Sequence, residues 1–329
     1  MDIMDWDGFR DYSTIKVDVN VKQNSQDVTV ATDTVNYVVD KTVTTFLHKY
    51  QTNEVVRAAL AAKQIYDYVG EEKYTLNLLK KDELEKLLPN DNPDLTSARS
   101  EAIDLLTQRE KNPDGFVCGL YHDYVSNKYI LAFAGTQDYD IADIYTDITQ
   151  ALGLFSGQYN YAITLAATLA NLGLDYIITG HSLGGGLASA AACASGKTTY
   201  TFNAAGLHRS TLENYLPSSG ADQEYNVSKE QLLARYENSA SFVNAYYVDF
   251  DLLSIVQDWS PLPNAIGNRI GLDGQYDLEV AFNLLSLTPT PASGLVKIIR
   301  AAKLLEPTIQ CHSMEQVLFG LLGSSCYDN

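Results

Sequence analysis

Residues 174–194 read LDYIITGHSLGGGLASAAACA, and this stretch decides the fold. Its first part, 174–179, is apolar and rich in β-branched residues, which predicts a short strand. The small residues 187–194 favour a helix. Between them lies the sequence Gly-His-Ser-Leu-Gly, residues 180–184, which has the pattern GxSxG. A serine at a sharp turn between a strand and a helix is typical of a nucleophile elbow, where the hydroxyl is exposed at the edge of a sheet.

The residues around Ser182 fit this interpretation. Gly180 and Gly184 remove side chains that would collide at the turn. The helix after the serine directs its unpaired N–H groups toward any negatively charged oxygen that forms on a substrate. The N–H of Leu183 is therefore one candidate donor of an oxyanion hole, and Thr136, which closes the segment KYILAFAGT, is the other. We predict that Ser182 is the nucleophile of an acyl-transfer reaction.

A serine hydroxyl needs a base that a carboxylate orients. In folds with a nucleophile elbow, these residues follow one another along the chain in the order serine, acid, histidine. The chain has five histidines. Three of them, His48, His122 and His181, precede the serine. His208 follows too soon after the serine to leave room for an acid on a strand between them. Elimination therefore leaves His312 as the predicted base.

The acid should lie just beyond the carboxyl end of a strand, because active sites of open α/β sheets gather at that edge. Residues 242–248 (FVNAYYV) predict such a strand. Asp251 follows it by a few residues and is the preferred acid. Asp249 is the first alternative, since it can still belong to the strand, and Asp258 is a more distant third.

The alternation of strand and helix patterns predicts an α/β fold with a mostly parallel central sheet and helices on both faces. Residues 1–50 contain an alternating pattern around the turn QNSQD, which predicts a small N-terminal β-hairpin appendage. The catalytic domain is expected over 51–329. The proline-flanked segment 259–293 is a candidate lid over the active-site face. Among the helices, we expect one around 75–88.

Composition limits the partners. With 23 basic and 41 acidic residues the net charge is −18, which argues against nucleic acid as a partner. The same charge disfavours long-range attraction to anionic membranes, although a membrane surface of zwitterionic lipid is still open to apolar docking. The acidic N-terminus, MDIMDWDGFRDYSTIK, does not resemble a secretory signal, so we expect export, if any, without a cleavable leader. A disulfide between Cys311 and Cys326 is left open.

Four acids, Asp138, Asp140, Asp143 and Asp147, lie close together in the sequence. Such a group can bind a cation, but the spacing is not that of a known calcium loop. The alternative is a helix start, with Asp140 as the N-cap and Asp143 in the first turn, where the helix dipole favours carboxylates. We favour the helix start and expect neither a metal nor another cofactor.

Several segments together resemble the class 3 lipases, the fungal-type triacylglycerol lipase superfamily, and most of all its bacterial branch of phospholipase and lipase effectors, which includes effectors of type VI secretion. The segments are KYILAFAGTQ, DIADIYTDI, QYNYAITLA, ITGHSLGGGLASAAA, TFNAAGL and the His-Ser-Met of residues 312–314. The likeness covers roughly residues 54–320. Two positions depart from the family pattern, which often has arginine at Ala134 and tryptophan at Ile144.

This resemblance implies the α/β-hydrolase fold and a serine carboxyl-ester hydrolase of the phospholipase A or lipase type, with Ser182, Asp251 and His312 as its triad. The expected partner is a lipid or ester substrate. A role as an antibacterial effector would add specialised secretion to a target-cell periplasm and a neutralising immunity protein. The alternatives are a small-ester esterase, a thioesterase, and a hydrolase fold kept only as a non-catalytic interaction module.

Overall fold

The computed structural model describes residues 53–67, 76–108, 112–135, 157–215, 227–274 and 311–323. Their centre is a seven-stranded sheet in which spatial order follows chain order. Its strands are β1 (Leu76–Leu78), β2 (Cys118–Asp123), β3 (Lys128–Phe133), β4 (Tyr176–His181), β5 (Thr199–Phe202), β6 (Val243–Val248) and β7 (Asn268–Leu272). The pairs β1–β2 and β2–β3 are antiparallel, and the four pairs from β3 to β7 are parallel.

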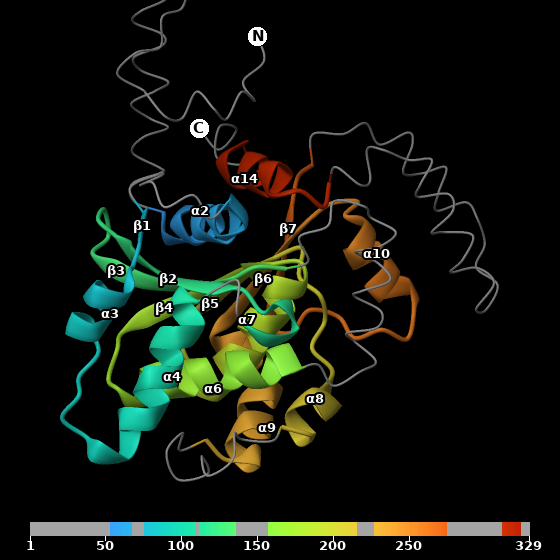
Figure 1. Cartoon of the computed structure of the whole chain (residues 1–329). Coiled ribbons are helices and arrows are strands. Elements are labelled where there is room, and N and C mark those ends of the chain that lie inside the picture. The colour runs from blue at the N-terminus through green and yellow to red at the C-terminus, as the bar shows by residue number, and fades with distance from the viewer. Residues whose placement is uncertain are drawn as a thin grey trace, which may run out of the picture.

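Helices cover both faces of this sheet. Figure 1 shows α2 and α14 on one face, and α4, α6, α7 and α9 on the other. The described helices are α2 (Glu54–Asp67), α3 (Lys81–Leu87), α4 (Thr96–Thr107), α6 (Gly157–Asn171), α7 (Leu183–Ser195), α8 (Arg209–Glu213), α9 (Lys229–Glu237), α10 (Leu252–Trp259) and α14 (Met314–Gly323). This arrangement confirms the predicted α/β fold with a mostly parallel sheet, and it is the arrangement of an α/β-hydrolase.

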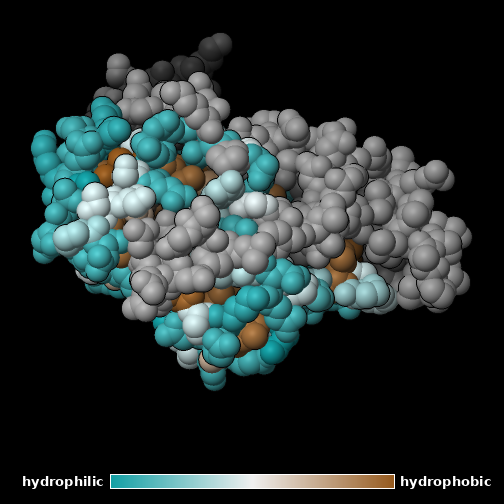
Figure 2. Space-filling view, turned by 60° about the horizontal axis from the view of Figure 1, so that its bottom comes forward, coloured by the Kyte–Doolittle hydropathy of each residue, from teal (hydrophilic) through white to brown (hydrophobic). Residues whose placement is uncertain are grey.

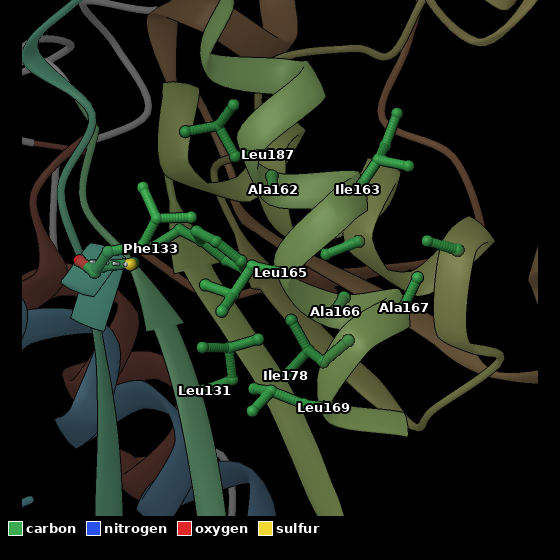
Figure 3. Packing of buried hydrophobic residues seen from close by; sticks show 14 of the residues in the cluster. Leu131, Phe133, Ala162, Ile163, Leu165, Ala166, Ala167, Leu169, Ile178 and Leu187 are labelled. Carbon is green, nitrogen blue, oxygen red and sulfur yellow. Dashed lines mark hydrogen bonds between the residues drawn. The ribbon is translucent and has the colours of Figure 1, made fainter. Parts of the chain in front are cut away.

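The larger part of the core lies between the sheet and helices α6 and α7. Figure 3 shows α6 placing Leu165 and Leu169 toward Leu131 of β3 and Ile178 of β4. These four side chains are fully buried. Strands buried on both faces need apolar residues at successive positions, which explains the near-continuous apolar sequence of β3 and β4. The core thus fixes the strand that ends at the serine turn.

The opposite face has its own core, formed by α2, α14 and the sheet residues beneath them. A buried ion pair crosses it, since Arg57 of α2 binds the carboxylate of Asp123 at the end of β2. Arg57 is 1% exposed and Asp123 is 0% exposed. Removing one partner of such a pair is costly because the other charge is left in the core.

Two expectations need correction. The helix expected around 75–88 is split, because Leu76–Leu78 pairs antiparallel with β2 as an edge strand and the helix begins only at Lys81. Within the candidate lid, 259–293, Asn268–Leu272 pairs with β6 as strand β7, so this part belongs to the sheet. Residues 275–293 of that segment and the expected hairpin appendage, 1–50, lie outside the described residues.

Cys311 is a buried free thiol among the described residues. Cys326, the other cysteine of the disulfide that the sequence left open, lies outside those residues. Among the helices that the structure describes, none is long and apolar enough to cross a membrane. On the face shown in Figure 2 the coloured residues are mostly hydrophilic, and the hydrophobic ones form small separate areas.

Candidate active site

Ser182 lies at the junction of β4 and α7 in a backbone conformation with φ 57° and ψ −128°. Such a conformation is rare for a residue with a side chain and costs on the order of 1–3 kcal/mol, so it persists only where the surroundings impose it. Gly180 and Gly184 make the turn feasible. A Cβ on Gly180 would lie 2.1 Å from the carbonyl oxygen of Gly184, and one on Gly184 would lie 2.3 Å from that of Phe133.

A continuous chain of hydrogen bonds leads away from this serine. Oγ of Ser182 lies 2.9 Å from Nε2 of His312, and Nδ1 of the same ring lies 2.6 Å from Oδ1 of Asp251. Ser182 is 4% exposed and Asp251 is 0% exposed. The carboxylate accepts the Nδ1 proton, which leaves the lone pair of Nε2 facing the serine hydroxyl. The structure thus brings together the three residues that the sequence predicted to act together.

The position of Asp251 follows from a tight turn after β6. The strand ends at Val248, and Phe250 adopts φ 68°, an outlier for an aromatic residue. The N–H of Asp251 donates back to the carbonyl of Val248 at 3.0 Å. Asp251 is also the N-cap of α10, because its Oδ2 accepts the N–H of Ser254 at 2.8 Å. Both carboxylate oxygens are therefore held, one by the helix and one by the imidazole.

The other two candidate acids lie elsewhere. Asp249 is exposed on the same turn, where partial desolvation of its carboxyl and then the nearby charge of Asp273 raise its pKa. Asp258 is near the end of α10 and binds Arg269 at 2.7 Å. Of the three acids, Asp251 is the one that contacts His312.

The structure describes one of the two expected oxyanion donors. The N–H of Leu183 is in the first turn of α7, where helical N–H groups have no partner inside the helix. The end of β3 lies beside it, since a Cβ on Gly135 would be 3.2 Å from the nitrogen of Leu183. Thr136, the next residue, lies outside the described residues.

His181, which the sequence analysis considered only as a base, contacts the site in another way. Its Nε2 lies 2.6 Å from the carbonyl oxygen of His312, and its Nδ1 lies 3.2 Å from the hydroxyl of Tyr66 on α2. Burial, followed by the neighbouring ring of His312, lowers the pKa of His181 to about 3. The ring is therefore neutral at physiological pH.

Asn203 was also missed. It is fully buried just after β5 and adopts φ 43°. Its Nδ2 donates to the carbonyl oxygen of Cys311 at 3.0 Å, and its Oδ1 accepts the N–H of Val248 at 2.9 Å. The available sequence signal was that both polar residues directly follow apolar strand patterns, where a buried side chain would need hydrogen-bond partners.

Within the described ranges, no group of three or more histidine, cysteine, aspartate or glutamate side chains could hold a metal ion. The acidic cluster at 138–147 lies outside those ranges.

A strained serine between a strand and a helix, hydrogen-bonded to a histidine that an aspartate orients, on a mostly parallel sheet, defines the class of α/β-hydrolase serine enzymes. Comparison with protein families specifies the class further. A phospholipase-like family, described as the Tle-like phospholipase domain, matches residues 57–314. Because that range is most of the sequence, this chain belongs to that phospholipase family, whose members are carboxylic ester hydrolases.

A curated relative shares part of the chain. The extracellular phospholipase A1 of Serratia liquefaciens is 36% identical over 160 residues, which are 48% of this chain and 45% of that protein. The chain thus matches less than half of that relative's length.

Proposed function

We propose that this chain hydrolyses a fatty acyl ester of glycerophospholipids, with Ser182 as nucleophile, His312 as general base and Asp251 as the acid that orients it. The observation that carries the proposal is the hydrogen-bond chain from Ser182 through His312 to Asp251. Family membership supports a phospholipid substrate. The name of the Serratia relative supports the sn-1 ester as the bond that is cleaved.

The reaction proceeds in two halves. Nε2 of His312 takes the proton of Ser182 as Oγ attacks the ester carbonyl carbon, and Asp251 stabilises the resulting imidazolium. The carbonyl oxygen becomes an oxyanion, which accepts the N–H of Leu183 and a second donor, for which we propose Thr136. Collapse of this intermediate breaks the C–O bond, and His312 protonates the leaving glycerol oxygen. Water, activated by the same base, then releases the fatty acid from the acyl-enzyme.

The direct test uses a phospholipid with different acyl chains at its two positions. Mass spectrometry of the products identifies which fatty acid is released, and sn-1 release is expected. Release of the sn-2 chain alone would contradict the proposed position. Hydrolysis of short esters or thioesters without attack on phospholipid would favour an esterase or thioesterase, and no hydrolysis at all would favour a non-catalytic module.

Variants test the assigned roles. Ser182→Ala should lower kcat at least about 1,000-fold with no loss of folding. Ser189→Ala is the matched control, since Ser189 is a buried serine on the same helix that binds only the carbonyl of Gly185 among the contacts described. Asp251→Asn should lower kcat by about 10,000-fold, and Asp249→Asn should change it little. The reverse order for the two aspartates would overturn the assignment of the acid.

An effector role belongs to the same proposal. It is supported by the resemblance to secreted bacterial lipase effectors, and it predicts toxicity only where the enzyme reaches its lipid. Expression directed to the periplasm of a bacterial host should inhibit growth, while Ser182→Ala directed there and the active enzyme kept in the cytoplasm should not. Equal growth in all three would contradict this role, and an immunity protein would be expected to restore growth.

A further inference from the structure

The backbone just before and at His312 is held by two side chains at the ends of strands β4 and β5. The carbonyl oxygens of two successive residues, Cys311 and His312, accept hydrogen bonds from Asn203 and His181 respectively. We propose that His181 and Asn203 are positioning residues that fix the backbone of His312, so that its ring meets Ser182 in reactive geometry. This inference rests on the function proposed above.

The hydrogen bonds of His181 also fix its tautomer. A carbonyl oxygen can only accept, so the proton is on Nε2 and the lone pair on Nδ1. The hydroxyl of Tyr66 lies 3.2 Å from both acceptors of His181, Nδ1 and the backbone carbonyl oxygen, and its own oxygen accepts the N–H of Gly135 at 2.9 Å. One chain of hydrogen bonds therefore runs from the end of β3, beside Leu183, to the carbonyl of His312.

His181 is uncharged, which is favourable for a ring that lies beside His312. Its ring centroid lies 4.8 Å from that of His312. During the reaction His312 becomes an imidazolium, and a second positive charge at this distance would oppose that step. Because the pKa of His181 is lowered to about 3, the ring can donate a hydrogen bond to the backbone without carrying charge.

Asn203 anchors the same segment from a second direction. Its amide joins the carbonyl of Cys311 to the N–H of Val248, the last residue of β6. Asp251 follows from that strand end and its N–H binds the carbonyl of Val248. One side chain therefore links the backbone that carries the base to the backbone that carries the acid.

The test compares His181→Leu, which removes the Nε2 donor at similar volume, with His181→Gln, whose amide can replace it. His208→Leu is the matched control, since His208 is exposed at the start of α8. Activity is measured on phospholipid and on a soluble short ester, and nucleophile activation by the rate at which a fluorophosphonate labels Ser182. Circular dichroism and thermal melts select the folded variants, and proton NMR follows the downfield resonance between His312 and Asp251.

We expect His181→Leu to lower kcat and the labelling rate by about 10- to 100-fold with KM nearly unchanged, because a small misplacement of a catalytic group has effects of this size. The downfield resonance should shift or broaden. His181→Gln should recover to within about threefold of the wild type, and Asn203→Ala should resemble His181→Leu. The control should match the wild type.

Three results would overturn the inference. They are an unchanged kcat in folded His181→Leu and Asn203→Ala, equal losses in His181→Leu and His181→Gln, and a loss confined to KM. If His181→Leu does not fold, kcat is compared between His181→Gln, which should stay within about threefold of the wild type, and Asn203→Ala, which should be lower. Equal kcat values in these two variants would then overturn the inference. Failure of the proposed function is distinct, because the wild type would then neither hydrolyse either ester nor react with the fluorophosphonate.

Discussion

Replacing Arg57 with methionine tests how helix α2 is held on the sheet. Nε of Arg57 donates to Oδ2 of Asp123 at 3.0 Å, and a second guanidinium N–H binds Oδ1. Arg57→Met leaves this fully buried carboxylate without its counter-charge, and breaking a buried pair in this way costs about 3–5 kcal/mol. At about 2 °C per kcal/mol for a chain of this size, Tm should fall by roughly 6–10 °C at pH 7.

The loss should also depend on pH. Burial acts to raise the pKa of Asp123, but hydrogen bonds from Arg57 and Ser126 outweigh it, so the pKa is lowered. A lowered folded-state pKa adds stability that is fully present above the ordinary value of about 3.9 and is lost as pH falls through the folded value. In Arg57→Met the main lowering contact is gone, and protonation relieves the buried charge. The difference from the wild type should therefore be smaller at pH 4 than at pH 7.

Thermal unfolding followed by circular dichroism at both pH values measures this effect. Arg209→Met is the matched control, because Arg209 pairs with Glu213 and Glu237 on the surface, where solvent screening leaves ion pairs with little effect on stability. A Tm for Arg57→Met within 1–2 °C of the wild type at pH 7, near the size expected of a surface pair, would refute the buried-charge explanation. A larger loss at pH 4 than at pH 7 would refute the sign of the pH dependence.

Three further predictions concern the site and its approach to lipid. Gly184→Ala should reduce kcat at least about 100-fold, because its Cβ would lie 2.3 Å from the carbonyl oxygen of Phe133; ester hydrolysis at wild-type rate would contradict this. Asp258→Asn should leave kcat within about twofold and Tm within 1–2 °C, since Asp258 binds Arg269 near the surface; a large fall in kcat would return it as a candidate acid. The net charge of the chain is −18, so it should hydrolyse anionic vesicles more slowly than zwitterionic ones at about 0.01 M salt. The difference between the two rates should become smaller at about 0.1 M salt, because the Debye length falls from about 30 to about 10 Å. A difference between the two rates that does not change with salt would show that charge does not control the association of the enzyme with the vesicle.

Much of the fold was predictable from local pattern. The β-branched and apolar residues of β4, the glycines around Ser182 and the small residues of α7 indicate strand, turn and helix independently. The sheet could then be predicted because successive strands and helices in such a pattern form parallel units. Leu76–Leu78 was missed because three residues are too few to show alternation, and its neighbours favour a helix. Pairing with β2, a non-local interaction, decides its conformation.

The choice of acid shows where sequence reasoning reaches its limit. The end of β6 indicated both Asp249 and Asp251 as candidates, because both follow the strand within three residues, and the preference for Asp251 rested on its position beyond the strand. What separates them is the turn at Phe250, whose positive φ reverses the chain and places Asp251 at the start of α10. A phenylalanine carries no sequence signal for that conformation, since positive φ is expected at glycine or asparagine. The distinction therefore depends on tertiary packing.

His181 and Asn203 are instructive in a different way. Each is a polar residue at a buried position next to a functional motif, and each is explained by a partner far away in sequence. The contact of His181 with the carbonyl of His312 joins residues 131 positions apart, and that of Asn203 with Cys311 joins residues 108 apart. The need for a partner was evident from burial alone, but no local pattern identifies a partner at that separation.

The same separations bear on how the base is held. Closing a longer loop costs only about 0.6 kcal/mol for each doubling of its length, so a base can be supplied from a distant part of the chain at little entropic cost. A long connection does not by itself position the histidine ring accurately, however, and proton transfer from Ser182 requires Nε2 of His312 within about 3 Å. His181 and Asn203 can position the ring, since the strand ends that carry them are fixed by the core on both faces of the sheet. On this reasoning the carbonyls of Cys311 and His312, more than the connection that leads to them, determine where the base meets the nucleophile.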